Sequence, residues 1–239
     1  MATIRESRTF EGFEVTTMVT GTLWRQNCYL VRDEVTNATI VIDPGDEPSA
    51  IACALSESGG VVDSIVLTHG HHDHTGGVAE LAAHFNVNAY ISEEDLRLAL
   101  RAPTYALAFH NRRIPRPHPL VTFPLGSTLR TGRFSLATVA APGHTPGSIV
   151  IHAPGLVLTG DTLLFESIGR TDLPGGDLEA LMGSVEHLVQ LPGPTVVLPG
   201  HGRAWTIAEA RAWWRSGAAR DVLRQRQQIV AEIPASSAP

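Results

Sequence analysis

Four side chains with nitrogen or oxygen donor atoms crowd into one short segment of this chain. The segment 68–74 reads Thr-His-Gly-His-His-Asp-His, and it places His69, His71, Asp73 and His74 directly after the apolar run 61–67. Imidazole and carboxylate together suit Zn, Fe or Mn, because Ca and Mg prefer shells made only of oxygen. With 11 His in 239 residues a single histidine means little, so the clustering is what predicts a metal site rather than a polar loop.

Three later donor residues share a local pattern with this cluster, in which a short apolar strand leads into a Gly-bordered turn and then the donor. His144 lies in Pro-Gly-His-Thr-Pro-Gly, Asp161 in Gly-Asp-Thr and His201 in Pro-Gly-His-Gly. Each of these residues alone is weak evidence for a metal site, because a histidine beside a turn is more often an ordinary loop residue and a strand-end Asp is usually a helix cap. Together the four strand ends favour one shared site at an edge of the sheets.

Strands that end on one side of the fold must position these donors. Short apolar segments predict an antiparallel meander at 14–20, 27–33 and 39–43, closed by a turn at 43–46. Further strands are predicted at 61–67, 87–91, 128–140, 148–152, 156–159 and 195–198. Helices are predicted at 48–58, at 76–85, after a capping box at 92–95, at 177–190, after a capping box at 206–209, and at 215–230.

The alternation of strands and helices predicts one α/β domain, in which two sheets are faced by helices. We expect it to span residues 1–232, with 233–239 as a disordered tail. Residues 101–119 break the pattern: four prolines and a scatter of Arg predict a loop or lid. His72 is expected to face solvent. His110 and His118 are expected at the surface, and the alternative is that they flank the mouth of the site.

Length and charge exclude several other classes of protein. A chain of 239 residues can bury one large core, and a net charge of −6 argues against a broad nucleic-acid surface. No apolar run reaches the roughly 18 residues needed to span a bilayer, and residues 1–10 lack the apolar stretch of a secretion signal. We therefore expect a cytoplasmic protein with no membrane partner, in which Cys28 and Cys53 stay reduced.

From these residues the chain resembles the metallo-β-lactamase fold superfamily and, within it, the glyoxalase II-like (hydroxyacylglutathione hydrolase-like) branch. The segment 69–74 fits the HxHxDH motif, and the other three donors occur in the family's order. The likeness extends from Asn27-Cys28-Tyr29 to Gly200-His201-Gly202. It implies a four-layer αβ/βα sandwich with the metal site at the sheet edge.

The resemblance also implies a role for every donor. His69, His71 and His144 would hold one metal, and Asp161 would bridge to a second ion held by the remaining donors, Asp73, His74 and His201. The cofactors would be two divalent ions, zinc first, with iron or manganese as alternatives. Such a pair lowers the pKa of a shared water from about 15.7 toward ~7, so that hydroxide attacks an acyl carbon. Asp73 is in addition the candidate catalytic residue.

The segment 167–177 resembles the GRTD segment found in small glyoxalase II-like proteins and in persulfide dioxygenases. Arg170 and Asp172 fall where the larger glyoxalase II enzymes have a Lys and a Tyr that bind glutathione. Arg170 is the candidate substrate-binding residue, because its fork can grip a carboxylate; the structural alternative is an ion pair with Asp172. Residues 204–239 are too short for the helical C-terminal domain of the larger enzymes.

The resulting hypothesis is a metal-dependent hydrolase of S-acyl thioesters of a small thiol, such as S-lactoylglutathione. A thiolate with a pKa near about 8.5 leaves without a strong general acid. The alternative of the same fold is a mononuclear-iron persulfide dioxygenase that uses His69, His144 and Asp161. The expected partner is the small-molecule substrate alone, and Trp213-Trp214 is expected either to cover the core or to form a homodimer contact.

Overall fold

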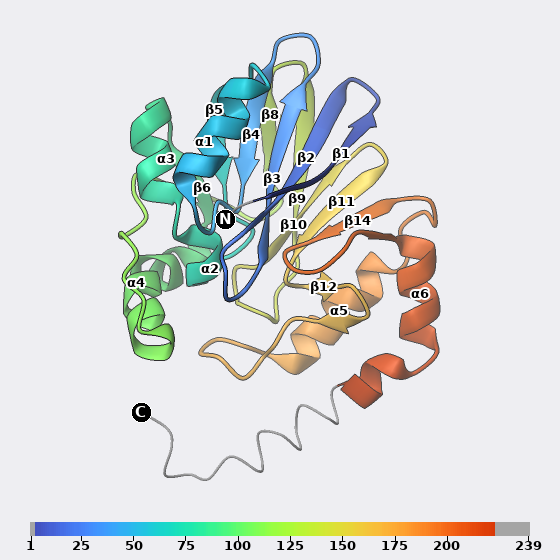
Figure 1. Cartoon of the computed structure of the whole chain (residues 1–239). Helices are drawn as coiled ribbons and strands as arrows, with labels where there is room; N and C mark the ends of the chain where they lie inside the picture. The colour runs from blue at the N-terminus through green and yellow to red at the C-terminus, as the bar shows by residue number, and fades with distance from the viewer. Residues whose placement is uncertain (1–2, 223–239) are drawn as a thin grey trace.

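Two β-sheets lie face to face, and helices cover the outer face of each, in the computed structural model of this chain (Figure 1), which describes residues 3–222. This is the predicted four-layer αβ/βα sandwich. Three apolar cores separate the four layers. The core between the sheets is built from inward-facing side chains of both, among them Phe13, Ile40, Leu136, Ile149 and Ile151.

The first sheet begins as an antiparallel meander and ends as a parallel array. Its strands follow chain order: β1 (Thr3–Phe10), β2 (Phe13–Thr20), β3 (Gln26–Asp33), β4 (Ala38–Ile42), β5 (Val61–Val66), β6 (Ala89–Ser92) and β7 (Leu120–Phe123). Pairs from β1 to β4 are antiparallel, and those from β4 to β7 are parallel. The meander was predicted, but the two edge strands were not. β1 carries charges and β7 lies among prolines, and both features are typical of sheet edges.

The second sheet has the order β15-β14-β11-β10-β9-β8. Its strands are β8 (Thr128–Thr131), β9 (Phe134–Ala140), β10 (Ile149–Ala153), β11 (Leu156–Gly160), β14 (Val196–Pro199) and β15 (Trp205–Thr206). β11 and β14 run parallel, so their carboxyl ends lie side by side. Between them in the chain lies a small hairpin of β12 (Leu163–Leu164) and β13 (Ser167–Ile168).

The helices divide between the two outer faces (Figure 1). Side chains of α1 (Pro48–Glu57) and α3 (Val78–Phe85) pack on the first sheet, and those of α5 (Leu178–Leu188) and α6 (Ile207–Arg215) pack on the second. Asp177 caps α5 by accepting a hydrogen bond from the Ala180 amide at 3.0 Å. The predicted capping box between Thr206 and Glu209 is present at the start of α6.

The predicted loop at 101–119 is wrong over its first half. A 3-10 turn (Glu93–Asp95) leads into α4 (Leu96–His110), which continues through Pro103. Ala99, Ala102 and Ala106 form a fully buried stripe at helical spacing, and this packing outweighs the one hydrogen bond that the proline removes. Residues 111–119 carry no helix or strand, as predicted.

The capping box predicted at Ser92 is also absent. The Ser92 hydroxyl makes no cap hydrogen bond and instead donates to the Gly147 carbonyl at 2.6 Å. The predicted helix at 215–230 lies mostly outside the described residues, as does the predicted tail 233–239, and the domain range 1–232 stays a prediction. Within residues 3–222, none of the helices combines the length and the hydropathy that crossing a bilayer requires.

Candidate metal centre

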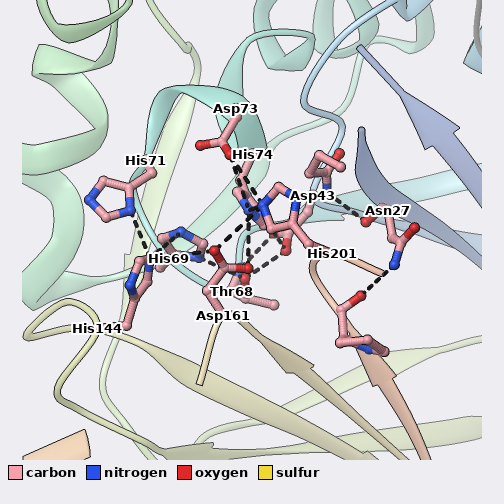
Figure 2. A network of polar contacts seen from close by, with 12 residues as sticks. Asn27, Asp43, Thr68, His69, His71, Asp73, His74, His144, Asp161 and His201 are labelled. Carbon is pink, nitrogen blue, oxygen red and sulfur yellow. Dashed lines mark hydrogen bonds and ion pairs between the residues drawn. The ribbon is translucent and has the colours of Figure 1, made fainter. Parts of the chain in front are cut away.

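The seven predicted donors meet at one edge of the two sheets (Figure 2). His69 and His71 follow β5, and the next two donors lie on the one-turn helix α2 (His72–Thr75), which was not predicted. The remaining three follow the ends of three strands of the second sheet, β9, β11 and β14: His144, Asp161 and His201. Residues up to 132 positions apart in the chain therefore share one site, as the strand-end pattern predicted.

His69, His71 and His144 form the first group of donors. One ring nitrogen from each lies within 4.8 Å of the others. His144 Nε2 is 2.9 Å from His71 Nδ1 and 3.2 Å from His69 Nε2. All three side chains are buried. Three imidazole nitrogens that converge in this way are a suitable donor set for zinc or iron.

Asp73, His74 and His201 form the second group of donors. Their donor atoms again lie within 4.8 Å of one another. His201 Nε2 is 3.3 Å from Asp73 Oδ2 and 3.4 Å from His74 Nε2. The group therefore offers two imidazole nitrogens and one carboxylate.

Asp161 lies between the two groups (Figure 2). Its Oδ2 is 3.7 Å from His144 Nε2 and 3.5 Å from His201 Nε2, while its Oδ1 is 3.5 Å from His74 Nε2. That buried Oδ1 has no hydrogen-bond partner among the described residues. A buried oxygen without a donor is costly, so its position indicates that a cation belongs here.

The orientation of the histidine rings supports the same conclusion. Nδ1 of His74 donates to Asp43 at 2.9 Å, Nδ1 of His144 to the Arg170 carbonyl at 2.8 Å, and Nδ1 of His201 to the Trp24 carbonyl at 3.0 Å. A ring whose Nδ1 carries the proton presents an unprotonated Nε2, which is the form that binds a metal. All three Nε2 atoms face the centre of the site.

The charges within the site fit two divalent cations. Burial lowers the pKa of His71 to about 3, and it lowers that of His69 well below its usual range, so both rings are neutral ligands at pH 7. Burial acts in the same direction on His201, but the carboxylates of Asp161 and Asp73 outweigh it and raise its pKa to about 10. In the metal-free chain these carboxylates hold protons on nearby rings, and a bound cation would replace those protons.

Asp43 orients two of the donors and was not predicted to do so. Its carboxylate accepts hydrogen bonds from the Thr68 amide at 2.7 Å, the Thr68 hydroxyl at 2.6 Å and His74 Nδ1 at 2.9 Å. The Thr68 hydroxyl in turn lies 3.1 Å from His69 Nδ1. Because these three hydrogen bonds occupy the carboxylate oxygens of Asp43, we assign Asp43 to positioning the metal-binding side chains rather than to binding a metal itself. The sequence held a signal for it, since Asp43-Pro44-Gly45 also follows an apolar strand.

Asp95 ties together the two loops that carry the first group. Its buried carboxylate accepts hydrogen bonds from the Gly70 amide at 2.7 Å, the Gly147 amide at 2.8 Å and the Thr145 hydroxyl at 2.7 Å. Burial raises the pKa of this carboxyl group, and the three donors act against that rise. No sequence signal distinguished Asp95, because its place at a helix start predicted only a cap.

The loop carrying His201 is held from the neighbouring sheet. Asn27 Nδ2 donates to the Pro199 carbonyl at 2.8 Å and to the Gly202 carbonyl at 3.0 Å. Gly200 leaves no room for a side chain: a Cβ there would lie 2.2 Å from Asp161 Oδ1. The glycine before His201 is therefore required by the close approach of the backbone to the bridging candidate.

A cavity of about 380 Å³ opens above the donors, which is the size expected of a small-molecule site. His72 was expected to face solvent, but it is half-buried, lines this cavity and stacks on His110 with ring centroids 4.8 Å apart. His110 also lines the cavity, whereas His118 is exposed as expected. The cavity was not visible in the sequence, because residues 101–110 were predicted as a loop or lid and not as the second half of α4.

Arg170, the candidate substrate-binding residue, lines the cavity but is paired. Its Nε donates to Asp172 Oδ1 at 2.8 Å and its Nη2 to Asp172 Oδ2 at 2.5 Å. This is the structural alternative foreseen for Arg170. A substrate carboxylate would have to compete with Asp172 for the guanidinium.

Two lesser interpretations can be checked directly. Cys28 is fully buried in the core between the first sheet and its helices, and burial raises the pKa of its thiol. Both observations agree with a packing role for Cys28 rather than with a nucleophile. Trp213 and Trp214 pack against the core under α5 and α6, so they cover the core. The homodimer contact stays a prediction.

The comparisons with known proteins agree with the fold and the donor set. Residues 21–201 match the family model described as the metallo-beta-lactamase superfamily, and the chain belongs to this superfamily. Fold, family and donor set together define a metallo-hydrolase.

Three relatives lie close to it. The "Hydroxyacylglutathione hydrolase GloC" of Haemophilus influenzae is 36% identical over 195 residues, which are 80% of this chain and 92% of that protein. The structure of TTHA1623 in a di-iron-bound form is 39% identical and superposes with a TM-score of 0.73 over 81% of this chain and 96% of the other. The BLEG-1 B3 metallo-beta-lactamase is 28% identical, with a TM-score of 0.76 over 82% and 95%.

Proposed function

We propose that this metallo-hydrolase cleaves S-acyl thioesters of a small thiol. The observation that carries the proposal is the convergence of seven donors beside a cavity of small-molecule size, which five of them line: His71, Asp73, His144, Asp161 and His201. The name of the Haemophilus influenzae relative supports an acyl-thiol substrate, and the di-iron form of TTHA1623 supports two metal ions. Zinc, iron and manganese all suit the donor set.

The chain's own residues would hold two cations and orient the reactants. We assign His69, His71 and His144 to one ion, Asp73, His74 and His201 to the other, and Asp161 to both. Two such ions supply hydroxide at neutral pH and offset the negative charge that develops on the attacked carbonyl oxygen. These seven residues are the metal ligands of the proposal.

Asp73 is the candidate catalytic residue because it lines the cavity as well as belonging to the second group. Burial raises the pKa of its carboxyl group, but His74 and His201 outweigh burial and hold that pKa well below the usual range. The Asp73 carboxylate is thus a weak base. It is suited to accept a hydrogen bond from the attacking water and so to orient that water, but not to retain a proton taken from it. The departing thiolate, with a pKa near about 8.5, needs no strong acid.

The test is hydrolysis of a panel of acyl-thiols by protein loaded in turn with zinc, iron and manganese. We expect S-lactoylglutathione and simple acyl-thiols to be cleaved, with activity lost on chelation and restored by the metal. A β-lactam serves as the comparison substrate, because one solved relative is named as a B3 metallo-beta-lactamase. Cleavage of the β-lactam with no turnover of any thioester would overturn the proposal.

A second candidate function, the mononuclear-iron persulfide dioxygenase, has a geometric basis of its own. His69, His144 and Asp161 also converge: His144 Nε2 is 3.2 Å from His69 Nε2 and 3.7 Å from Asp161 Oδ2. One iron per chain, with oxygen uptake on glutathione persulfide, would decide for it. Two metal ions per chain and thioester cleavage would decide against it.

The remaining sequence-based expectations stay predictions. They are a cytoplasmic location and the absence of nucleic-acid and membrane partners.

A further inference from the structure

We propose that the part of the substrate that occupies this cavity, either the acyl chain or the thiol, is uncharged and apolar. Aliphatic or aromatic thioesters are then preferred over S-lactoylglutathione. This inference rests on the proposed thioesterase function and names the substrate class of the same site. Three observations carry it: the two walls of the cavity and the state of its one arginine.

The first wall is aromatic. Trp24 from the β2–β3 connection and Tyr105 and Phe109 from α4 all line the cavity, together with Leu98. The rings of Tyr105 and Phe109 stack in parallel, with centroids 5.9 Å apart and planes at 9°. Trp24 meets the edge of His110 at 5.0 Å. Phe109 and Trp24 remain 49% and 44% exposed, so large apolar faces stand uncovered at the mouth.

The second wall is aliphatic. It comes from the hairpin and loop that follow β11, which contribute Leu164, Ile168, Leu173 and Pro174. An apolar group in contact with both walls would be removed from water. Each methylene buried in this way strengthens binding by about fourfold, which corresponds to ~0.8 kcal/mol.

The charges of the cavity disfavour an anionic thiol. Arg170 is the one permanently charged cation among the described residues that line the cavity. Its Nε and Nη2 both donate hydrogen bonds to the Asp172 carboxylate. Glutathione carries two carboxylates, and neither would meet an unpaired guanidinium on these walls. Placing a carboxylate against apolar side chains without a partner is unfavourable, so the walls select against such a group.

The test uses two series of thioesters with the metal-loaded full chain. In one series the acyl group lengthens from acetyl to octanoyl on N-acetylcysteamine, a neutral thiol. In the other the acyl group is fixed and the neutral thiol grows. We expect kcat/KM to rise about fourfold per methylene in at least one series until the cavity is filled, and to exceed that for S-lactoylglutathione. The series that rises shows which side of the thioester contacts the walls.

A flat or falling profile in both series, with measurable hydrolysis, would overturn this inference and leave the proposed function intact. Absence of any thioester hydrolysis would instead overturn the proposed function. In that case calorimetric binding of uncleavable S-alkyl thioethers decides the inference: affinity that rises from methyl to octyl supports it, and affinity that does not change refutes it.

Two variants on α4 provide a matched comparison. Phe109→Ala removes part of the aromatic wall, and we expect the gain per methylene to fall from about fourfold to less than about twofold. Leu107→Ala removes a similarly exposed apolar side chain that lies outside the cavity lining, and it should keep the full gain. Equal slopes for the two variants would contradict the assignment of the wall.

Discussion

At the scale of single residues, the arrangement depends most on Asp161. It is the one donor that faces both groups, and its Oδ1 is buried without a hydrogen-bond donor. The neighbouring backbone is shaped around it, since Gly200 permits no side chain at that approach. A neutral side chain of the same shape would keep the packing but remove the charge that two cations share.

Asp161→Asn is therefore expected to lower the metal content from the proposed two ions per chain to one or none and to reduce kcat/KM by about 100-fold or more. Elemental analysis and thioester hydrolysis measure the two effects. Asp177→Asn is the control, because Asn caps the start of α5 as well as Asp does. The Asp177 carboxylate accepts a hydrogen bond from the Ala180 amide, and Asp177 is neither one of the seven donors nor a residue of the cavity lining. Retention of two tightly bound ions by Asp161→Asn would show that this carboxylate is not shared.

His201 predicts a pH dependence for the metal-free protein. Its pKa in the folded chain is about 10, above the ordinary value of 6.5, so the folded state holds a proton that the unfolded chain releases. The resulting stabilisation is fully present below pH 6.5 and is lost as the pH rises toward about 10. Urea unfolding of the apoprotein at a series of pH values measures it. His201→Gln should show a smaller loss over this window, and identical profiles would contradict the assignment.

At the scale of secondary-structure elements, the turn before α4 acts as a clamp, because it is hydrogen-bonded to two loops at once, the loop that carries His69 and His71 and the loop that carries His144. Asp95, the last residue of that turn, accepts from Gly70 on one loop and from Gly147 and Thr145 on the other. α4 itself forms the aromatic wall of the cavity. One helix thus links the placement of His69, His71 and His144 to the shape of the substrate site.

Asp95→Asn should loosen this clamp, because its amide nitrogen would face groups that donate hydrogen bonds. We expect the free energy of unfolding to fall by ~1–3 kcal/mol and metal affinity to fall by about tenfold. Chemical denaturation and metal titration of the apoprotein measure these changes. Glu94→Gln, at the exposed neighbouring position, should leave both unchanged. An unaltered metal affinity in Asp95→Asn would show that the clamp is not needed for binding.

At the scale of the whole molecule, the centre joins both sheets. Donors from the first sheet and its loops meet donors from the second, so bound metal would link the two halves of the sandwich. Anything that binds only the folded state stabilises it, by about 2.7 kcal/mol when the free ligand is at 100 times its Kd. Removal of metal by a chelator is expected to lower the denaturation midpoint accordingly.

Calorimetry or denaturant unfolding with and without chelator tests this expectation, and added metal should restore the midpoint. Asp161→Asn should respond much less, because it is expected to hold fewer ions. A midpoint that does not move on complete metal removal would mean that the donors are held in place by packing alone.

The sequence by itself determined the donors and the edge at which they meet. Residue types fix the coordination chemistry, and His69, His144, Asp161 and His201 each follow an apolar strand, so alternation of strands and helices was enough to bring them together. Only the tertiary structure decided what surrounds them. The partners of Asp95 and Arg170 and the path of α4 through Pro103 are set by packing between segments far apart in the chain, and local patterns carry no information about such contacts.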